Sequence, residues 1–362
     1  MSGDEFPTVR AAAVQASSVF LDRERSTAKA CALIREAGAA RADIIAFPEG
    51  FIPAHPVWFH FHPATGEVST RLSVELFKNA VEIPGPEIGE LQRAAADAQA
   101  YVVVGVCEKS PNTTGTLYNS QVFLGPDGTL LGKRRKLMPT VGERLVHTGG
   151  SGDSLAVFNT RFGPASALIC GENSNPLAIF AMTAQYSRVH VMSWPNHFPA
   201  VGTPMRDRVA VDSRAFAQMS KAFVVSACGT IDDGAIAKLE LSEKDEALIR
   251  DPDFCGGSLI VAPDSRIIAG PLGNDEAMLY ADLDLDIGVR MKLRHDFAGH
   301  YNRPDIFQVT VNANVPQIFG IANATSNGWG EPPAVAPGGH EETPAIEPIQ
   351  QRAIGLAEGC DT

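Results

Sequence analysis

The chain has 362 residues, of which 44% are hydrophobic and 20% are charged, and its formal net charge is −12 at pH 7. This is the balance of an ordinary globular protein, and no apolar stretch reaches the roughly 18 residues that a membrane-spanning helix needs. The negative charge argues against a nucleic acid or an anionic membrane as a partner.

The first residues of the chain and the cysteines bear on its location. Met1–Arg10 lacks a basic region followed by an apolar core, which predicts that there is no secretory signal. The cysteines show no Cys-x-x-Cys pair and no histidine at metal-ligand spacing. They are Cys31, Cys107, Cys170, Cys228, Cys255 and Cys360. We therefore expect reduced thiols, no metal site and a cytoplasmic protein.

The N-terminal segment has the pattern of a parallel crossover unit. Val9–Ala16 is a candidate strand, apolar spacing predicts a helix over Arg23–Ala39, and Asp43–Phe47 is a second buried strand. Strand, helix and strand in this order join two parallel strands. A long polar and aromatic loop is expected from Phe51 to about Leu72.

The middle of the chain is predicted to contain hairpins. Tyr101–Val106 is a strong candidate for a buried strand. Leu117–Leu124 and Thr129–Lys133 flank the turn sequence Gly-Pro-Asp-Gly and should pair. Leu155–Phe158 and Ala165–Ile169 form a second pair of this kind, turned at a Gly-Pro sequence.

Further along, strands are expected at Val189–Trp194 and Ala222–Cys228, on either side of a helix over Arg206–Lys221. Shorter strands are expected at 258–262, 267–268 and 278–283. Helices and strands that alternate in this way predict a layered α/β domain with helices covering sheets.

The composition changes near the C-terminal end. Residues 331–348 are rich in proline, glycine and glutamate and have no periodic apolar pattern. We therefore expect the domain to occupy residues 1–320 and a largely irregular or disordered tail to occupy 321–362.

The most informative stretch is Ala165–Asn173, in which an apolar run leads directly into Cys170. Asn175 is a good N-cap and Pro176 suits the first position of a helix. Cys170 should therefore lie at a strand-to-helix corner, where a side chain is exposed near a helix N-terminus and a thiolate is favoured. The alternative is a buried structural cysteine, which describes most free cysteines.

Three other ionisable residues follow predicted strands. Glu49 follows the strand 43–47, where desolvation would raise its pKa toward that of a general base, unless it simply points into water. Lys136 ends the basic run 133–136 and precedes the apolar Leu137-Met138 pair, so it is expected to be buried, whereas the other three basic residues are expected to be solvated. Glu143 follows seven residues later, and it is either part of the same site or a loop glutamate paired with Arg144.

Glu49, Lys136 and Cys170, in this chain order, resemble the catalytic set of the nitrilase superfamily of carbon–nitrogen hydrolases. The resemblance extends over about residues 9–307, and Glu143 stands where the family has its second glutamate. The segments that resemble the family motifs are Phe47-Pro48-Glu49, Arg135-Lys136-Leu137-Met138-Pro139-Thr140 and Cys170-Gly171-Glu172-Asn173.

Two further segments are similar to the nitrile-cleaving branch. Glu49–Pro53, together with Pro56 and Trp58, is similar to its substrate loop, and Gly299–Phe307 is similar to its late signature. The sequence departs from the family where tryptophan is common, at Gly171 and in the segment Leu145-Val146-His147 after the second glutamate.

The resemblance implies a four-layer α-β-β-α sandwich and a nitrilase that converts a small-molecule nitrile to the carboxylic acid and ammonia. Cys170 would be the nucleophile and form a thioimidate and then a thioester, with Glu49 as general base. Lys136 would stabilise the developing charge, and Glu143 would orient Lys136 or bind water. The covalent sulfur makes a metal or organic cofactor unnecessary.

The resemblance also implies a homodimer that can extend into larger spirals. Trp58, Trp194 and Asn196 are candidates for the substrate pocket, and the backbone of Gly171 is a candidate anion donor. Packing in the core is the competing interpretation of both tryptophans.

Other functions remain open for the same residues. An amidase or carbamoyl hydrolase would use the same residues, and nitrile hydration would stop at the amide. A non-catalytic scaffold and a papain-like cysteine protease are less consistent with the residues, because the set is complete and the local protease signature is missing.

Overall fold

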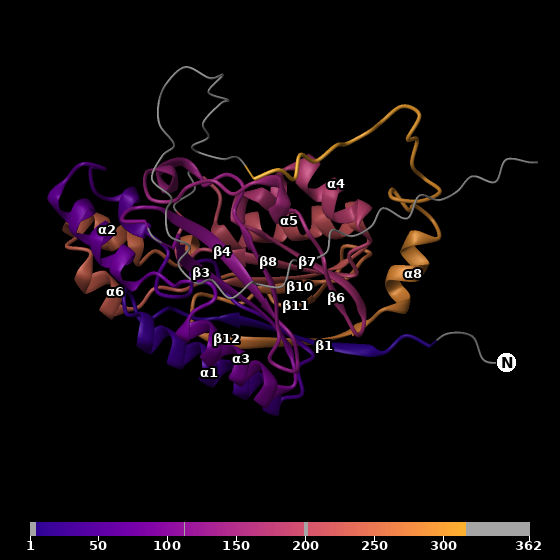
Figure 1. Cartoon of the computed structure of the whole chain (residues 1–362), viewed down its shortest axis with the longest axis horizontal. Coiled ribbons are helices and arrows are strands. Elements are labelled where there is room, and N and C mark those ends of the chain that lie inside the picture. The colour runs from indigo at the N-terminus through magenta and orange to yellow at the C-terminus, as the bar shows by residue number, and fades with distance from the viewer. Residues whose placement is uncertain (1–4, 112, 199–201, 316–362) are drawn as a thin grey trace, which may run out of the picture. The chain divides into compact units, whose positions relative to one another are not determined.

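Two mixed β-sheets stack face to face, and each has helices on its outer face (Figure 1). The structure is a computed structural model that describes residues 5–111, 113–198 and 202–315. In spatial order, the described strands of the first sheet are β12 (Ala277–Asp284), β1 (Thr8–Gln15), β2 (Ile44–Ala46), β3 (Tyr101–Lys109), β4 (Leu117–Leu124) and β5 (Leu130–Arg135). Those of the second sheet are β11 (Ile267–Ala269), β10 (Leu259–Val261), β9 (Phe223–Cys228), β8 (Val189–Trp194), β7 (Gly163–Ile169) and β6 (Phe158–Thr160).

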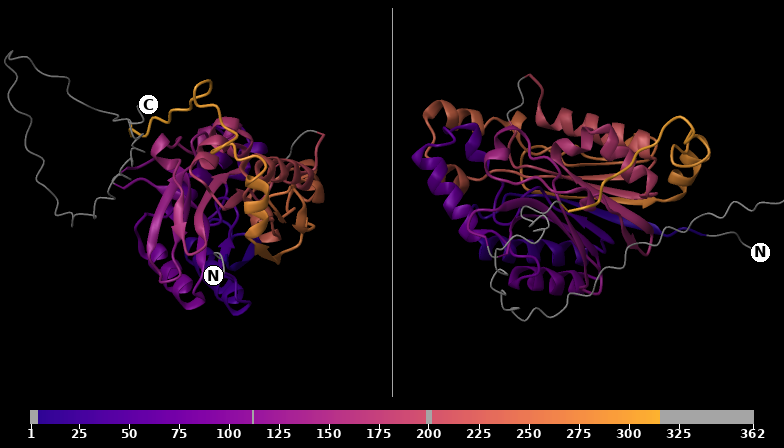
Figure 2. Two further views of the ribbon diagram at one scale, coloured as in Figure 1. Left: turned by 90° about the vertical axis from the view of Figure 1, so that its right-hand side faces the viewer. Right: turned by 45° about the horizontal axis from the view of Figure 1, so that its top comes forward.

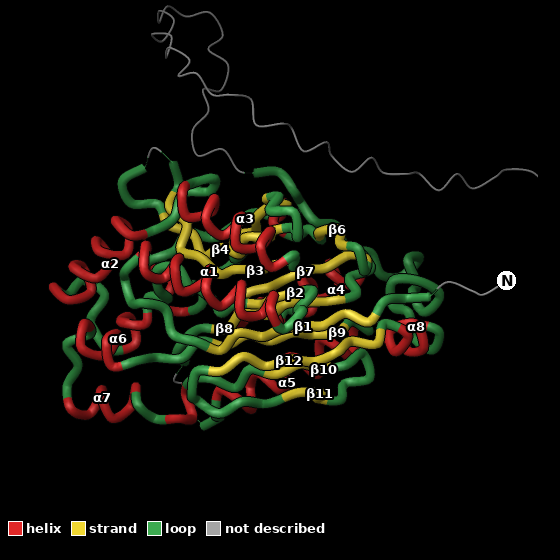
Figure 3. Tube along the Cα trace, turned by 90° about the horizontal axis from the view of Figure 1, so that it is seen from below, coloured by secondary structure: helices red, strands yellow, loops and turns green. Residues whose placement is uncertain are grey.

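The helices complete the outer layers and the two ends. α1 (Arg23–Ala39) and α3 (Pro86–Ala98) cover the first sheet, and α4 (Pro176–Ala184) and α5 (Met205–Ser220) cover the second (Figures 1 and 2). At one end lie α2 (Glu67–Asn79), α6 (Asp233–Lys238) and α7 (Glu243–Ile249), and at the other lies α8 (Asp286–Lys292) (Figure 3). The 3₁₀ helices are η1 (Val57–His60), η2 (Val141–Leu145), η3 (Gly152–Ser154), η4 (Cys170–Ser174) and η5 (Pro252–Phe254). The four-layer α-β-β-α sandwich is therefore confirmed.

Both faces of the central strands are buried, which explains why these strands are apolar at nearly every position. In the first sheet, Ile45 and Val102 pack in the core that includes residues of α1 and α3. Their neighbours Ile44 and Val103 pack in the core between the two sheets. A third core lies between the second sheet and α4 and α5.

The helix predicted over Arg23–Ala39 is present with these same bounds. The side chain of Asp22 accepts a hydrogen bond from the backbone N–H of Arg25 and so caps the first turn, and Ala30, Ile34 and Ala37 form the buried face. The predicted strands and the first hairpin are also present, with ends that differ by a few residues. The second hairpin is present, but its turn is at 161–162 rather than at the Gly-Pro sequence, which belongs to β7, and β6 shares only Phe158 with the predicted strand.

The prediction of a continuous loop from Phe51 to Leu72 was wrong. η1 forms within it, and α2 begins at Glu67. Ser69, Leu72 and Leu76 are buried at helical spacing, and they pack in a cluster at the end of the molecule rather than against a sheet. The short apolar stripe of α2 is stabilised by packing in this end cluster.

Parallel pairing of β2 with β1 and β3, and of β8 with β7 and β9, aligns the carboxyl ends of these strands. The two sheets are joined there, because the backbone N–H of Glu49 donates to the carbonyl of Trp194 at 3.0 Å and Ser193 Oγ donates to the carbonyl of Phe47 at 2.8 Å. The ends of β2, β7 and β8 thus meet at one place.

Within the described ranges, no helix has the length and apolar character needed to cross a membrane. The five described cysteines are all free thiols. The predicted tail, the domain boundary near residue 320 and Cys360 lie outside the described residues.

Candidate active site

Glu49 lies just beyond β2, in a turn that is held tightly against β3. A Cβ added to Gly105 of β3 would lie 2.1 Å from the carbonyl oxygen of Pro48, so only glycine allows the turn to approach this closely. The side chain of Glu49 is completely buried. The sequence left open whether this carboxylate is desolvated or points into water, and the structure has it buried.

Lys136 follows β5 and is buried, as predicted. Its Nζ donates to Glu49 Oε1 at 2.8 Å and to Glu143 Oε2 at 2.6 Å. One ammonium therefore bridges two carboxylates that are 94 residues apart in sequence (143 − 49 = 94). Glu143 is not paired with Arg144, whose Nε donates to the carbonyl of Pro139 instead.

Glu143 has three further contacts that fix its position. Its Oε2 also accepts the backbone N–H of Thr140 at 2.8 Å, which closes a capping box at the start of η2. Asn119 of β4 donates from Nδ2 to Glu143 Oε1 at 2.7 Å and to Glu49 Oε1 at 2.6 Å. His147 Nδ1 lies 3.1 Å from Glu143 Oε1, and its Nε2 lies 3.4 Å from the sulfur of Cys107.

Cys170 lies at the corner where β7 ends and η4 begins. Its backbone φ is +50°, a left-handed conformation that is uncommon for a residue with a Cβ. After η4, Asn175 caps α4 through hydrogen bonds from the backbone N–H groups of Leu177 and Ala178, with Pro176 at the first turn, as predicted. The sequence did not predict the short 3₁₀ turn between the cysteine and this helix.

A buried ion pair fixes this turn. Arg134 contacts Glu172 in a bidentate arrangement, with N···O distances of 2.8 and 3.0 Å. Glu172 also accepts the backbone N–H groups of Ile169 and Leu137. The expectation that Arg134 is solvated was wrong, because its side chain is only 1% exposed. In an edge strand next to lysine and arginine, nothing local shows that this one guanidinium points inward.

The two carboxylates of the cluster have pKa values that move in opposite directions. Burial, reinforced by the charge of Glu143, raises the pKa of Glu49 to about 7. Burial also acts on Glu143, but Lys136 and the contact with His147 hold the pKa of Glu143 well below its usual range. For Lys136, burial favours the neutral amine, and the two carboxylates outweigh it and raise the pKa above its usual value.

Cys170 is close enough to this cluster to respond to its charges. Burial and the charge of Glu49 raise the pKa of the Cys170 thiol well above its usual value, although Lys136 and the backbone N–H of Gly171 act in the opposite direction. The prediction of an exposed cysteine with thiolate character is therefore wrong. A buried thiol of this kind needs a base to remove its proton before it can attack a substrate.

A cavity of about 90 Å³ reaches Cys170, Gly171 and Trp194. It is also lined by Thr140, Ser174, Phe198, Met205, Arg208 and Asp212. Of the predicted pocket residues, Gly171 and Trp194 thus line the cavity at the sulfur. Asn196 lines a much smaller cavity together with Glu49 and His55. Trp58 lines neither cavity and packs against Phe20 in the cluster at the end of the molecule.

Sequence reasoning missed Asn119, His147, Arg134 and Glu172. Glu172 stood inside a recognised motif, but its partner Arg134 comes from β5 in the other sheet. His147 stood in the segment that departs from the family, at i,i+4 spacing from Glu143, and this spacing was the signal that could have found it. Within the described part of the chain, no group of three or more His, Cys, Asp and Glu side chains could hold a metal ion.

Comparisons with known proteins identify the family of this chain. The profile of the family described as Carbon-nitrogen hydrolase matches residues 10–290. An arylacetonitrilase of Aspergillus kawachii is 34% identical over 314 residues, which cover 85% of this chain and 93% of the relative. A nitrilase of Bacillus sp. (strain OxB-1) is 34% identical over 307 residues, 84% of this chain and 88% of the relative.

Solved structures show the same fold at low sequence identity. Nit3 of Saccharomyces cerevisiae, a member of the nitrilase superfamily, has a TM-score of 0.62 at 18% identity, and the match covers 84% of this chain and all of that chain. The NitFhit protein of Caenorhabditis elegans has a TM-score of 0.64 at 16% identity, with 90% of this chain and 72% of that chain covered.

The fold and the relatives together define the class of protein: this chain belongs to the carbon–nitrogen hydrolase family. Within that family it is a member of the nitrilase branch, since curated relatives of that branch align with most of its length.

Proposed function

We propose that the protein is a nitrilase that hydrolyses an organic nitrile to the carboxylic acid and ammonia, with Cys170 as the nucleophile. The single observation that carries this proposal is the buried position of Lys136 Nζ between Glu49 and Glu143, in a cluster whose charges act on the pKa of the Cys170 thiol. The names of the relatives, arylacetonitrilase and nitrilase, support a nitrile as the substrate.

In the proposed reaction, Glu49 accepts the thiol proton while the sulfur of Cys170 attacks the nitrile carbon. The nitrile nitrogen takes up that proton, and a covalent thioimidate forms. Water adds to the thioimidate with Glu49 again as base, and the C–N bond breaks to release ammonia. A second water cleaves the remaining thioester to give the acid and the free thiol.

Lys136 stabilises the charge that develops on the substrate nitrogen and oxygen in the tetrahedral species. Glu143 keeps this ammonium charged and directed, because its two oxygens are held by Lys136, Thr140, Asn119 and His147. Gly171 offers a backbone N–H next to the sulfur, and Trp194 forms part of the pocket wall. Asn196 is near Glu49, and Trp58 has no part in the proposal.

A second product is supported by the names of two relatives, from Lupinus angustifolius and Nicotiana tabacum. A protein of Lupinus angustifolius that is 34% identical over 316 residues is named a bifunctional nitrilase and nitrile hydratase. The tetrahedral species has two leaving groups: expulsion of ammonia leads to the acid, and expulsion of the thiol leads to the amide. An amidase or carbamoyl hydrolase with the same residues is the remaining alternative.

The experiment is a panel of aliphatic, aromatic and arylaliphatic nitriles and their matched amides, with ammonia, acid and amide measured separately. We expect nitriles to be turned over, and the Cys170→Ala protein to lose all of this activity. The Cys170→Ala protein should also lose the covalent adduct that mass spectrometry detects in the native protein during turnover. Nitrile turnover that survives Cys170→Ala would refute the proposal, and turnover of amides alone would favour the amidase alternative.

We also propose that the protein forms a homodimer. The outer helices α4 and α5 carry exposed apolar side chains, including Leu177 and Val211, which are 63% and 65% exposed. Apolar residues that gather on an outer layer in this way are typical of surfaces that bind another protein chain. The predicted cytoplasmic location and the larger spiral assembly stay predictions.

A further inference from the structure

A second cavity lies away from Cys170, at the end of the molecule where α8 packs. Its volume is about 160 Å³, and no residue of it lines the cavity at the sulfur. Its lining residues are Tyr186, Arg188, Lys221, Phe223, Leu285, Gly288, Val289 and Lys292. Three of them are cationic and none is acidic, although the whole chain has a net charge of −12. We call this cavity the cationic pocket.

Lys221 is the most buried of the three cations, with a relative exposure of only 2%. It ends α5 in a left-handed conformation with φ of +58°, where glycine is usual. Among the described residues, its Nζ donates one hydrogen bond, to the carbonyl of Gln218. Burial lowers the pKa of Lys221, which is the cost of holding an ammonium without a carboxylate beside it.

Each cation packs over an aromatic ring. Arg188 lies 4.8 Å from the ring centre of Phe6, Lys221 lies 5.5 Å from that of Phe297, and Lys292 lies 5.4 Å from that of Tyr186. Such contacts orient a cation and leave its hydrogen-bond donors largely unused.

Carboxylates are scarce around the pocket. In the described ranges, Lys292 has one ion pair, with Asp296 at 3.7 Å, and neither Arg188 nor Lys221 has any. Arg188 makes one long side-chain hydrogen bond, 3.5 Å to the carbonyl of Phe162. The pocket therefore holds more positive charge than its own residues balance.

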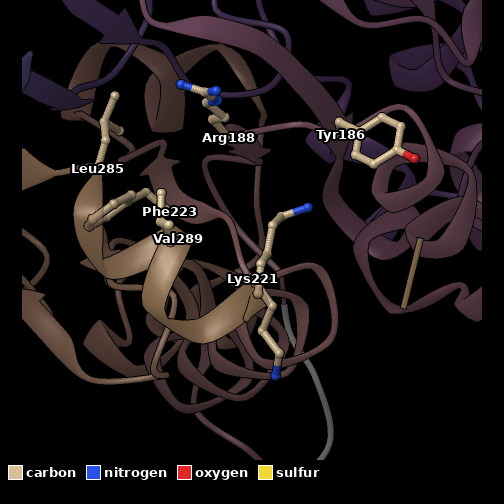
Figure 4. Close-up of a pocket in the computed structure, with 8 residues that line it drawn as sticks. Tyr186, Arg188, Lys221, Phe223, Leu285 and Val289 are labelled. Atoms are coloured by element: carbon tan, nitrogen blue, oxygen red, sulfur yellow. The ribbon is translucent and has the colours of Figure 1, made fainter. Parts of the chain in front are cut away.

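The opposite wall of the pocket is apolar. Figure 4 shows Leu285, Phe223 and Val289 grouped on one side, with Tyr186 on the other side and Arg188 between Leu285 and Tyr186. Gly288 of α8 also lines this pocket, so no side chain from that position takes up its space.

We propose that the cationic pocket binds a small oxyanion, either a phosphate or the carboxylate of a small organic acid, separately from the catalytic site. The guanidinium of Arg188 matches two oxygens of such a group, and the ammonium groups of Lys221 and Lys292 add point charges. The apolar wall accepts a small carbon body attached to the anion. This site does not depend on the proposed reaction.

The test is a calorimetric titration of the full chain with inorganic phosphate and, in a second arm, with benzoate, at constant ionic strength kept with chloride. The Cys170→Ala protein serves as the background, so that neither probe is consumed or held covalently. We expect saturable binding of at least one probe, and affinity at least about tenfold weaker in Arg188→Gln and Lys292→Gln.

The matched control is Arg290→Gln, which removes one positive charge from the same helix as Lys292. Arg290 is exposed, does not line the pocket and pairs with Asp284. The affinity of the Arg290→Gln protein for the probe should equal that of the background protein. Binding of one probe alone identifies the ligand as a phosphate or as a carboxylate. No saturable binding, or equal weakening in Arg290→Gln, would overturn the proposal.

Discussion

At the scale of single residues, two glutamates that contact the same ammonium, Lys136, have pKa values that shift in opposite directions. Both are buried and both bond to the same ammonium, but Glu143 also accepts hydrogen bonds from Thr140 and Asn119 and contacts His147. These contacts hold the pKa of Glu143 low, whereas burial raises that of Glu49 to about 7. One carboxylate therefore stays charged while the other can accept a proton near neutral pH.

The first prediction concerns pH. Glu49 must be anionic to accept the thiol proton, and its pKa in the folded protein is about 7. Above that value most molecules are active, and below it kcat/KM should fall by roughly tenfold per pH unit. The measurement is kcat/KM against pH with a neutral nitrile. A flat profile through this range would show that Glu49 is not the base.

The second prediction concerns His147. His147→Leu removes the contact with Glu143 Oε1 and leaves the buried sulfur of Cys107 without its partner. We expect the free energy of unfolding to fall by about 1–3 kcal/mol and kcat to fall while KM changes little.

Urea unfolding and steady-state kinetics measure both effects of His147→Leu. His147→Asn retains a donor near the Nδ1 position and should restore part of kcat. An unchanged kcat in the leucine variant would mean that His147 only fills space.

At the scale of elements, the turn from β7 into η4 depends on β5. Glu172 binds Arg134 of β5 and accepts two backbone N–H groups. One belongs to Ile169, which precedes Cys170, and the other belongs to Leu137, which follows Lys136. The strained φ of Cys170 is thus supported by an ion pair that comes from a strand of the other sheet.

The third prediction is that Arg134→Met destabilises the protein by about 3–5 kcal/mol, because it leaves Glu172 buried without its counter-charge. Arg35→Met is the control, since its ion pair with Asp97 is exposed and should contribute less than about 1 kcal/mol. Denaturant unfolding compares the two variants. If both lose the same small amount, the buried pair has no special structural role.

The fourth prediction is that Gly105→Ala displaces the Glu49 turn. The new Cβ would lie 2.1 Å from the Pro48 carbonyl oxygen and 2.8 Å from the Gly50 nitrogen, so the backbone must move. We expect a loss of about 1–3 kcal/mol and a lower kcat.

The matched control for Gly105→Ala is Gly115→Ala, where a Cβ meets nothing within 4 Å. It should leave kcat unchanged. Circular dichroism checks the fold of both variants. Equal kcat in the two would show that the close approach of the Glu49 turn to β3 does not affect catalysis.

At the scale of the whole molecule, three cores lie between the layers of the sandwich, and some helices also leave apolar side chains exposed on their outer side. α5 contributes Phe216 to the core beneath it and leaves Val211 exposed on its outer side. A helix that is apolar on two sides generally packs against something on both.

The fifth prediction follows from this. Val211→Glu should lower the molecular mass measured by light scattering from that of a dimer to that of a monomer, since an unpaired charge would be buried in the interface. Lys78→Glu, on α2, is the control and should leave the mass unchanged. A native protein that is monomeric at all concentrations would contradict the proposed dimer.

Much of the fold could be predicted from the sequence, because local patterns are sufficient where an element packs against a sheet. The helix Arg23–Ala39, the hairpin of β4 and β5 and the N-cap at Asn175 were all predicted from such patterns. α2 was missed because its short apolar stripe packs against the end cluster rather than a sheet. The burial of Arg134 was missed for a related reason, since its partner belongs to another part of the chain.

The sequence by itself determined the layered α/β class, and its resemblance to the nitrilase superfamily singled out Glu49, Lys136, Cys170 and Glu143 as the candidate site. Only the tertiary structure decided that one ammonium bridges two carboxylates, that the thiol is buried, and that three cationic residues line a pocket near α8. Distances and desolvation depend on which chain segments meet in space, and the order of residues along the chain does not specify these contacts.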